Sequence, residues 1–329
     1  MNDADDLEKF SNDLSNRKYD SEVCFLCGRS LENLKTTDEH VIPRWAQNRF
    51  ELWNQELTLL NHSKIPYRYL TVPCCEECNS RQLQPIETSM ASAVSQGADA
   101  VRKLGNKVLF LWLGKIFYGL LYRELMLSSD RKTPSAPPIV PVEIIREYEK
   151  HLFFLQEARG KIESVGFSSP GSIFVFQTQT HTNEAFQWDF CDNLETYFIA
   201  IRMGKVGIIG VLADGGAQQL AADFYDELKD FPLHPIQFRE LCAVFSYRST
   251  KATRTPKYVT ISDNPHKVVQ IPLGGYSAKP LFDDWNMDEF AKYLAYYTGQ
   301  PLEYLRPDSN KIASYIYDVD DKLMFFPFQ

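Results

Sequence analysis

Three short segments decide how this chain folds: CFLC (24–27), DEHVIP (38–43) and CEECN (75–79). The first and last segments each hold a C-x-x-C pair, which is the spacing of the knuckles of a structural zinc site. We expect four thiolates to close a tetrahedron around one zinc ion and to leave no position open for chemistry. The predicted ligands are Cys24, Cys27, Cys75 and Cys78, with the x2 spacing favouring Cys75 over its neighbour Cys74.

These residues resemble the HNH (ββα-metal) endonucleases, and most closely the endonuclease VII-like pattern of C-x-x-C, acid-His and C-x-x-C-Asn. The resemblance covers roughly residues 20 to 90. It implies that Glu39 and Asn79 bind one divalent cation and that His40 is the general base. The family more often has Asp at the position of Glu39, so Asp38 is a rival ligand.

The family also has a middle Asn that steadies the catalytic His. The residues that could take this role here are Asn54, Asn61 and His62. A neutral imidazole and a bound cation are sufficient for phosphodiester hydrolysis, because one activates water and the other offsets charge on the phosphate. Carboxylate and amide oxygens suit Mg²⁺ or Mn²⁺ better than zinc, so two different metals are expected.

Two short segments beside the motif have predictable backbone structure. Val41-Ile42-Pro43 is apolar and predicts a short strand ended by proline, and Cys78-Asn79-Ser80 predicts the start of a helix. The knuckles are expected to bring this strand end and this helix start together.

Two other classes of protein fit part of the pattern. A zinc-ribbon adaptor has four cysteines without catalysis, and an RNase would use the same motif, since the motif does not recognise the 2′-hydroxyl. Cys191 and Cys242 lie in apolar surroundings and are predicted to be plain core residues.

Composition limits the remaining possibilities. The chain has 329 residues, 44% hydrophobic and 13% aromatic, which is enough for a sizeable core and predicts two domains. Seven cysteines, five of them near the knuckles, favour a reducing cytoplasm, and the polar, acidic start is unlike a signal peptide. The segment 108–127 is apolar, but Lys115, Arg123 and Glu124 interrupt it and favour a buried helix over a membrane span.

The net charge of −8 is unusual for a protein that grips DNA, because lysine and arginine drive nonspecific DNA binding by releasing counter-ions. We therefore expect weak DNA binding by the isolated chain and efficient cutting only after self-assembly or assembly with a nucleic-acid-binding protein. Basic residues that could still line a groove are Arg29, Arg44, Arg49, Lys64, Arg68 and Arg81.

The predicted fold class is α+β, with an HNH domain at residues 1–104, a helical connector and linker at 105–140 and a mixed α+β domain at 141–329 for regulation, sensing or docking. Expected helices cover residues 86–104, 108–127, 141–159 and 288–297, and strands cover 173–176, 198–203 and 206–212, the last two forming a hairpin across Gly204-Lys205.

The last two hundred residues hold no catalytic constellation in their sequence. His181, His234 and His266 lack metal-ligand spacing, and the turn at 213–216 lacks the Lys-Ser/Thr of a phosphate-binding loop. The aromatic C-terminus, residues 325–329, is expected to be docked on this chain or on a partner, because such a segment would be a liability if exposed.

An HNH domain followed by such a region looks like the layout of prokaryotic antiviral effector nucleases. In similar layouts the second part senses a cyclic oligonucleotide or docks on a short prokaryotic Argonaute. By this analogy the chain is expected to be a cytoplasmic, metal-dependent DNA endonuclease controlled by a partner or a signal nucleotide.

Overall fold

The computed structural model describes residues 3–133, 135–274, 279–306 and 311–328. Its class is mixed α+β, as predicted. The chain forms two compact units: unit 1 comprises residues 1–92, 107–168 and 258–269, and unit 2 comprises 93–106, 169–257 and 270–329. These units divide the chain differently from the predicted domains, whose boundaries at 104 and 140 remain predictions.

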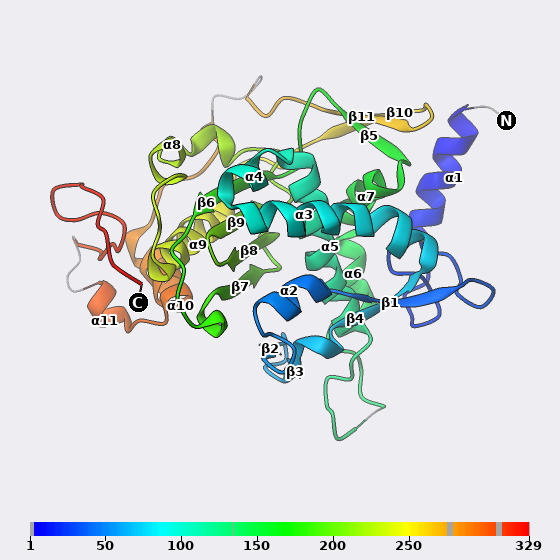
Figure 1. Cartoon of the computed structure of the whole chain (residues 1–329). Coiled ribbons are helices and arrows are strands. Elements are labelled where there is room, and N and C mark those ends of the chain that lie inside the picture. Colours follow the sequence, from blue (N-terminus) through cyan, green and yellow to red (C-terminus); the bar gives the residue numbers. More distant parts are fainter. Residues whose placement is uncertain (1–2, 134, 275–278, 307–310, 329) are drawn as a thin grey trace. The chain divides into compact units, whose positions relative to one another are not determined.

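Unit 1 contains small sheets rather than one large sheet (Figure 1). Strand β1 (Thr36–His40) runs antiparallel to β4 (Thr71–Cys75), with Thr36 opposite Cys75 and His40 opposite Thr71. The other strands form a hairpin and a three-stranded sheet of order β10-β11-β5; they are β2 (Glu56–Thr58), β3 (Lys64–Pro66), β5 (Ile162–Val165), β10 (Tyr258–Ile261) and β11 (His266–Gln270).

The predicted strand at Val41-Ile42-Pro43 is wrong, because β1 ends at His40. Val41 N still donates to Leu70 O at 2.8 Å, but Pro43 has no N–H for a further rung and instead caps helix α2 (Arg44–Arg49). Val41 and Ile42 are fully buried. The acid-His pair therefore lies inside the strand and not ahead of it.

A helical segment follows β4 without a break. It begins as a π-helical turn, η2 (Glu77–Leu83), and continues as α3 (Gln84–Gln96), which confirms a helix start at Cys78–Ser80. The predicted helix at 86–104 is interrupted at Gly97, whose φ of 111° is outside the helical range, so α4 (Ala98–Arg102) is separate.

Helix α5 (Gly105–Leu125) is the main buried helix of unit 1 and matches the prediction for residues 108–127. Gly119 lets it approach the chain after β1, because a Cβ there would meet the Val41 side chain at 3.2 Å. One turn earlier, Lys115 lies on the same side of the helix. Among the described residues, no helix is long and apolar enough to span a membrane.

The predicted helix at 141–159 is present in three pieces, with a break at Tyr148. The remaining helical elements of unit 1 are α1 (Asp3–Ser15), η1 (Tyr67–Tyr69), α6 (Val142–Glu147), α7 (Glu149–Leu155) and η3 (Gln156–Arg159).

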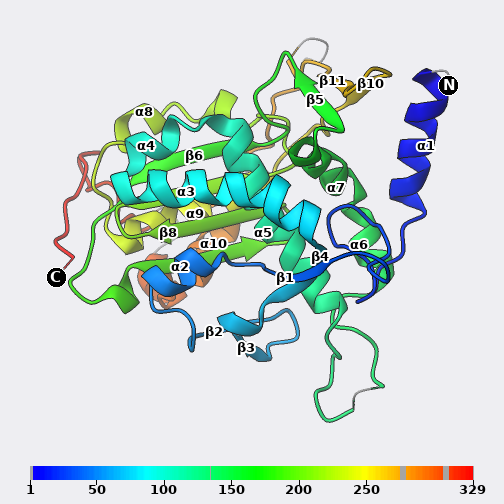
Figure 2. The same ribbon diagram turned by 45° about the vertical axis from the view of Figure 1, so that its right-hand side comes forward.

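Unit 2 is built on an antiparallel sheet of order β6-β9-β8-β7, seen in Figure 2 beside α4. The predicted hairpin is confirmed, since β8 pairs with β9 across Gly204, which has a φ of 58°. The strands are β6 (Ser172–Gln177), β7 (Trp188–Asn193), β8 (Phe198–Met203) and β9 (Val206–Val211).

One face of this sheet packs against α9 (Pro235–Thr250) and α10 (Met287–Thr298), and the core between them is rich in phenylalanine and tyrosine. The prediction of a helix at 288–297 is confirmed. Gly207 of β9 is needed for the close approach of α9, because a Cβ there would meet the Phe238 ring at 2.4 Å. The short elements of unit 2 are η4 (Glu184–Phe186), η5 (Gln219–Ala221), α8 (Tyr225–Leu228) and α11 (Leu302–Leu305).

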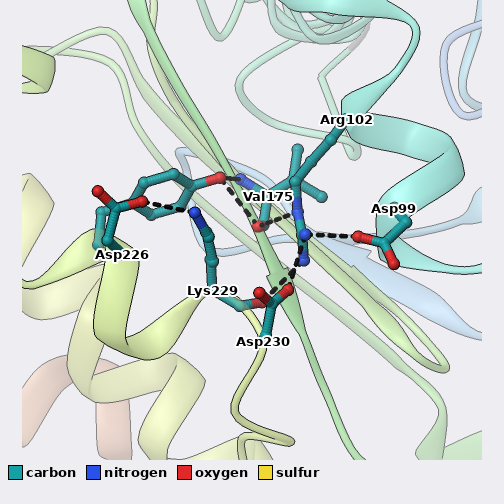
Figure 3. Close-up of polar contacts among 7 residues, drawn as sticks. Asp99, Arg102, Val175, Asp226, Lys229 and Asp230 are labelled. Carbon is teal, nitrogen blue, oxygen red and sulfur yellow. Dashed lines mark hydrogen bonds and ion pairs between the residues drawn. The ribbon is translucent and has the colours of Figure 1, made fainter.

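A polar cluster covers the edge strand β6 (Figure 3). Arg102 of α4 donates to Val175 O at 3.3 Å and to Lys229 O at 2.9 Å, and it pairs with Asp99 and Asp230 at 2.6 and 2.7 Å. The guanidinium thereby satisfies an edge carbonyl and joins two helical segments to the sheet, which blocks further strand addition at that position.

Candidate metal centre and catalytic residues

The four predicted cysteine ligands come together in unit 1, with their sulfur atoms all within 4.8 Å of one another. The first pair lies in a tight turn in which Gly28, with φ of 74°, donates to Cys24 O at 2.9 Å. The second pair spans the end of β4 and the start of η2. The turn is fixed on β4 because Phe25 N donates to Pro73 O at 2.9 Å.

The sulfur spacing fits a zinc ion. Zn–S bonds of about 2.3 Å in a tetrahedron require sulfur atoms about 3.8 Å apart, and the Cys27 and Cys75 sulfurs are 3.9 Å apart. Cys74 also lies close, 3.9 Å from Cys24, but it is outside the mutual four-sulfur group. The cluster supports the ligand set predicted from the spacing.

Arg29, one of the basic residues predicted as able to line a groove, lies against these sulfurs. Its Nε donates to Cys27 Sγ at 3.3 Å and its Nη2 to Cys75 Sγ at 3.4 Å, while Glu77 forms an ion pair with it at 2.5 Å. A zinc ion with four thiolates has a net charge of −2, so this guanidinium is placed to offset part of that charge. Hydrogen bonds from Cys27, Cys74 and Cys78 lower the pKa of the Cys24 thiol.

Strand alternation sorts the candidate catalytic residues onto two sides of β1. Thr37 and Glu39 share one side, and Asp38 and His40 share the other. Asn79 of η2 donates through Nδ2 to Thr37 Oγ1 at 2.9 Å, so it lies on the side of Glu39. Its Oδ1 is the amide atom able to bind a cation. This arrangement groups Glu39 with Asn79.

Glu39 is deeply buried, and its carboxylate forms an ion pair with the ammonium of Lys115. Glu87 pairs with the same ammonium at 2.6 Å, and Lys115 also donates to His40 O at 2.7 Å and to Val41 O at 3.3 Å. Burial raises the pKa of Glu39 to about 7, against the opposing effect of Lys115. Burial alone would lower the pKa of Lys115, but the two carboxylates hold it above its ordinary value.

Asp38 differs from Glu39 in access. It is exposed and lines a polar cavity of about 630 Å³ together with Glu22, Glu32, Thr37 and Pro73. The two acids are thus distinct: Glu39 shares its side of the strand with Asn79, and Asp38 is the more open to solvent.

His40 is half-exposed at the end of β1, and its pKa is lowered by burial and by the positive charges of Arg44 and Lys115. Its ring is therefore neutral near neutral pH, as a base must be. Gln47 of α2 is fully buried, with its Nε2 2.7 Å from Ile42 O and 3.3 Å from His40 Nδ1. The first contact is a strong hydrogen bond. The second is longer, and because an amide N–H can only donate, Nδ1 accepts it and the proton of the neutral ring is then on Nε2.

Sequence reasoning missed Gln47 as the residue beside His40. The three predicted candidates make other contacts: Asn54 bonds to Arg68, Asn61 donates to Ser129 O at 3.0 Å, and His62 occupies a turn with φ of 62°. The usable signal was spacing, because Gln47 follows His40 by seven residues across a proline that starts a helix.

The cysteines and histidines outside this centre have the structural roles predicted for them. Cys242 is fully buried in the core of unit 2, and Cys191 packs against the same core. His181, His234 and His266 all make aromatic ring contacts, and they are not part of the metal-ligand group found among the described residues.

The docking predicted for the C-terminus is observed in part. Phe328 N donates to Gln179 Oε1 at 2.8 Å, and Gln179 donates to Phe326 O at 2.7 Å. Phe325 is largely exposed, and Gln329 lies outside the described residues.

Comparison with known proteins gave no match of this chain to a family model, to a curated protein or to a solved structure.

Proposed function

We propose that this protein is a metal-dependent DNA endonuclease of the HNH type, with a structural zinc and a single acid-His-Asn catalytic centre. The main support is the position of Asn79. It follows the zinc ligand Cys78 directly and bonds to β1 three residues before His40, so the zinc knuckle ties the Asn to the acid-His strand. An adaptor zinc ribbon has no need of that link.

Each residue has a defined role in this proposal. His40 accepts a proton from water, and Gln47 holds its ring in position. Glu39 and Asn79 supply oxygen ligands for Mg²⁺ or Mn²⁺, with Asp38 as the rival to Glu39. When bound, the cation offsets charge that develops on the phosphate and on the leaving oxygen. Lys115 holds Glu39 and fixes the backbone at the end of β1.

The acidic net charge of −8 and the involvement of Arg29 with the cysteines support the further proposal that the lone chain binds DNA weakly. Assembly, either between copies of the chain or with a protein partner such as a short Argonaute, would then raise the affinity for DNA. A signal nucleotide is the other candidate activator for an antiviral effector of this layout.

The test is cleavage of plasmid, single-stranded DNA and RNA by wild type and by His40→Ala with Mg²⁺ or Mn²⁺, alone and with neighbouring gene products. Loss of the base is expected to lower the rate by about 10² to 10⁴. His62→Asn is the matched control, because it removes another histidine of unit 1. His62 has a left-handed backbone conformation, which asparagine adopts readily. Zinc content, measured by mass spectrometry, should be one ion per chain in all three proteins.

Glu39→Gln and Asp38→Asn separate the two rival ligands. Glu39→Gln should abolish cleavage, and Asp38→Asn should leave most of it. If His40→Ala cuts as well as wild type, the nuclease proposal fails. If no protein cuts any substrate while zinc remains bound, the zinc-ribbon adaptor is the better description, and cutting confined to RNA would identify an RNase.

A further inference from the structure

A cavity of about 280 Å³ lies in unit 2 where helix α9 begins over the ends of β7 and β8. Its volume is close to the lower end of the range for small-molecule sites. Both charged and aromatic side chains line it, the most relevant to the argument being Phe186, Trp188, Arg202, His234, Arg239 and Phe328.

Arg202 is the unusual member of this set. It stands on β8, facing the same side of the sheet as the core residues Phe198 and Ala200, and its side chain is only 3% exposed. Its Nη2 donates to Phe186 O at 2.7 Å, whereas its Nε and Nη1 are buried without a hydrogen-bond partner among the residues that the structure describes. A guanidinium offers five N–H donors, so most of its bonding capacity is unused.

The nearby carboxylate does not satisfy this charge. Asp189 is held by Arg239, which bonds to its two oxygens at 2.7 and 2.8 Å, while the Nε of Arg202 is 4.0 Å from Asp189. Two guanidinium groups therefore share one carboxylate, and one positive charge is left in excess inside a cavity. Burying an unpaired charge is strongly unfavourable, so such an arrangement indicates a missing anion.

Two further features favour an oxyanion at this place. The N-terminus of α9, a helix of 16 residues, opens onto the cavity and carries partial positive charge. His234 caps that helix by accepting from Ile236 N through Nδ1, so its neutral ring has the proton on Nε2 and can donate. Each of these groups is a donor or a positive pole.

The aromatic side chains define the rest of the ligand. Phe328 lies with its ring centre 5.8 Å from the Arg202 guanidinium and 5.1 Å from the His234 ring. Phe186 and Trp188 also line the cavity. Such rings bind a planar group by stacking, and the bonds from Gln179 hold the backbone beside Phe328 in place.

We propose that this cavity is a binding site for a small molecule that joins an oxyanion, phosphate or carboxylate, to a planar ring. The oxyanion contacts Arg202 and the start of α9, and the ring packs among Phe186, Trp188 and Phe328. Nucleoside monophosphates and aryl carboxylates both have this chemistry. The site is independent of the catalytic centre proposed above.

Isothermal titration calorimetry of the full chain tests the site, with the four ribonucleoside monophosphates, indole-3-acetate and inorganic phosphate as separate probes. At least one ring-bearing anion should bind at least tenfold more tightly than inorganic phosphate. Arg202→Met should weaken that binding tenfold or more. Lys205→Met is the matched control, because it removes one positive charge from the exposed turn of the same hairpin and should leave affinity unchanged.

Phe328→Ala provides a second variant outside the sheet core. It should weaken the ring-bearing anion without changing the binding of inorganic phosphate. Circular dichroism and thermal unfolding establish that the variants are folded. The proposal is overturned if wild type binds none of the probes at millimolar concentration, or if Arg202→Met binds as tightly as Lys205→Met. Because the readout is binding, failure of the nuclease proposal leaves this result unaffected.

Discussion

Lys115 of unit 1 and Arg202 of unit 2 are both deeply buried cations, and they are treated in opposite ways. In unit 1, Lys115 is 2% exposed and contacts two carboxylates and two backbone carbonyls. In unit 2, Arg202 is 3% exposed but, within the described part of the chain, donates a single hydrogen bond and has its nearest carboxylate, that of Asp189, 4.0 Å away. The two side chains are buried to the same degree, but Lys115 has many more polar partners than Arg202.

This difference separates a structural charge from a binding charge. A buried charge with a full set of partners stabilises the fold only when all partners are present, so its removal exposes their own desolvation cost. A buried charge with few partners gives the fold little and becomes favourable only when a ligand supplies the missing acceptors. Removing each charge in turn tests this difference.

The largest effect is expected for Lys115→Met. The change keeps the volume but leaves the Glu39 and Glu87 carboxylates without a counter-ion in a buried place, and it frees the carbonyls at the end of β1. Breaking a buried pair of this kind costs about 3 to 5 kcal/mol of unfolding free energy. Urea unfolding, read by hydrogen exchange of the amides in β1 and α5, measures the loss within unit 1.

Lys35→Met is the control for this variant, because Lys35 pairs with Glu76 on the surface and is 75% exposed. A surface pair is worth less than about 1 kcal/mol. The triple variant Lys115→Met, Glu39→Gln, Glu87→Gln should recover much of the lost stability. Equal stability of Lys115→Met and Lys35→Met would show that the cluster is not the structural charge described here.

Sequence alone predicted the groups whose partners are near in sequence or fixed by spacing. The four-cysteine cluster, the hairpin across Gly204 and the helix at 108–127 follow from such local patterns. The strand predicted for residues 41–43 was wrong, because a buried apolar run has the same composition in a strand and in an extended core segment.

The roles of the buried cations Lys115 and Arg202 were beyond local reasoning. By sequence alone Lys115 interrupts an apolar run and argues only against a membrane span, since its partners Glu39 and Glu87 lie in other elements. Arg202 sits at the end of an apolar strand with no local sign that it faces inward. Their roles depend on which distant groups the fold brings to them, and strand or helix periodicity does not encode that.

A second, intermediate effect is expected for His151, a buried ionisable group that is neutral rather than charged. It is 3% exposed, packs against Phe110 and Phe117 and contacts Gly114 O at 3.1 Å through Nε2. Burial lowers its pKa to about 4, against the opposing effect of that hydrogen bond. Because the folded pKa is below the unfolded one, stability is present above pH 6.5 and is lost as the pH falls toward 4.

The expected loss from this group is about 2 kcal/mol between pH 7.5 and pH 5. The measurement compares the pH dependence of urea unfolding in wild type and His151→Phe, which keeps an aromatic ring at the site. The gap between the two proteins should change by that amount in favour of the variant as the pH falls. Parallel curves would mean that His151 has the same pKa in the folded and the unfolded protein, so that burial does not disfavour its charged form.

The smallest effect is expected for Arg202→Met without ligand. The substitution removes a buried charge that makes one hydrogen bond, leaves the Asp189–Arg239 pair in place and keeps an unbranched side chain to fill the space. The free energy of unfolding should therefore change by less than about 1 kcal/mol, or increase, as when poorly compensated buried ions are replaced by apolar residues.

Urea unfolding, read by hydrogen exchange of the amides in β8 and α9, measures this change, with Lys205→Met as the charge-matched control. A loss as large as that of Lys115→Met would place Arg202 with the structural charges. A small change in the free protein, together with loss of ligand binding, is the combination that only a binding charge predicts, because its partners arrive with the ligand.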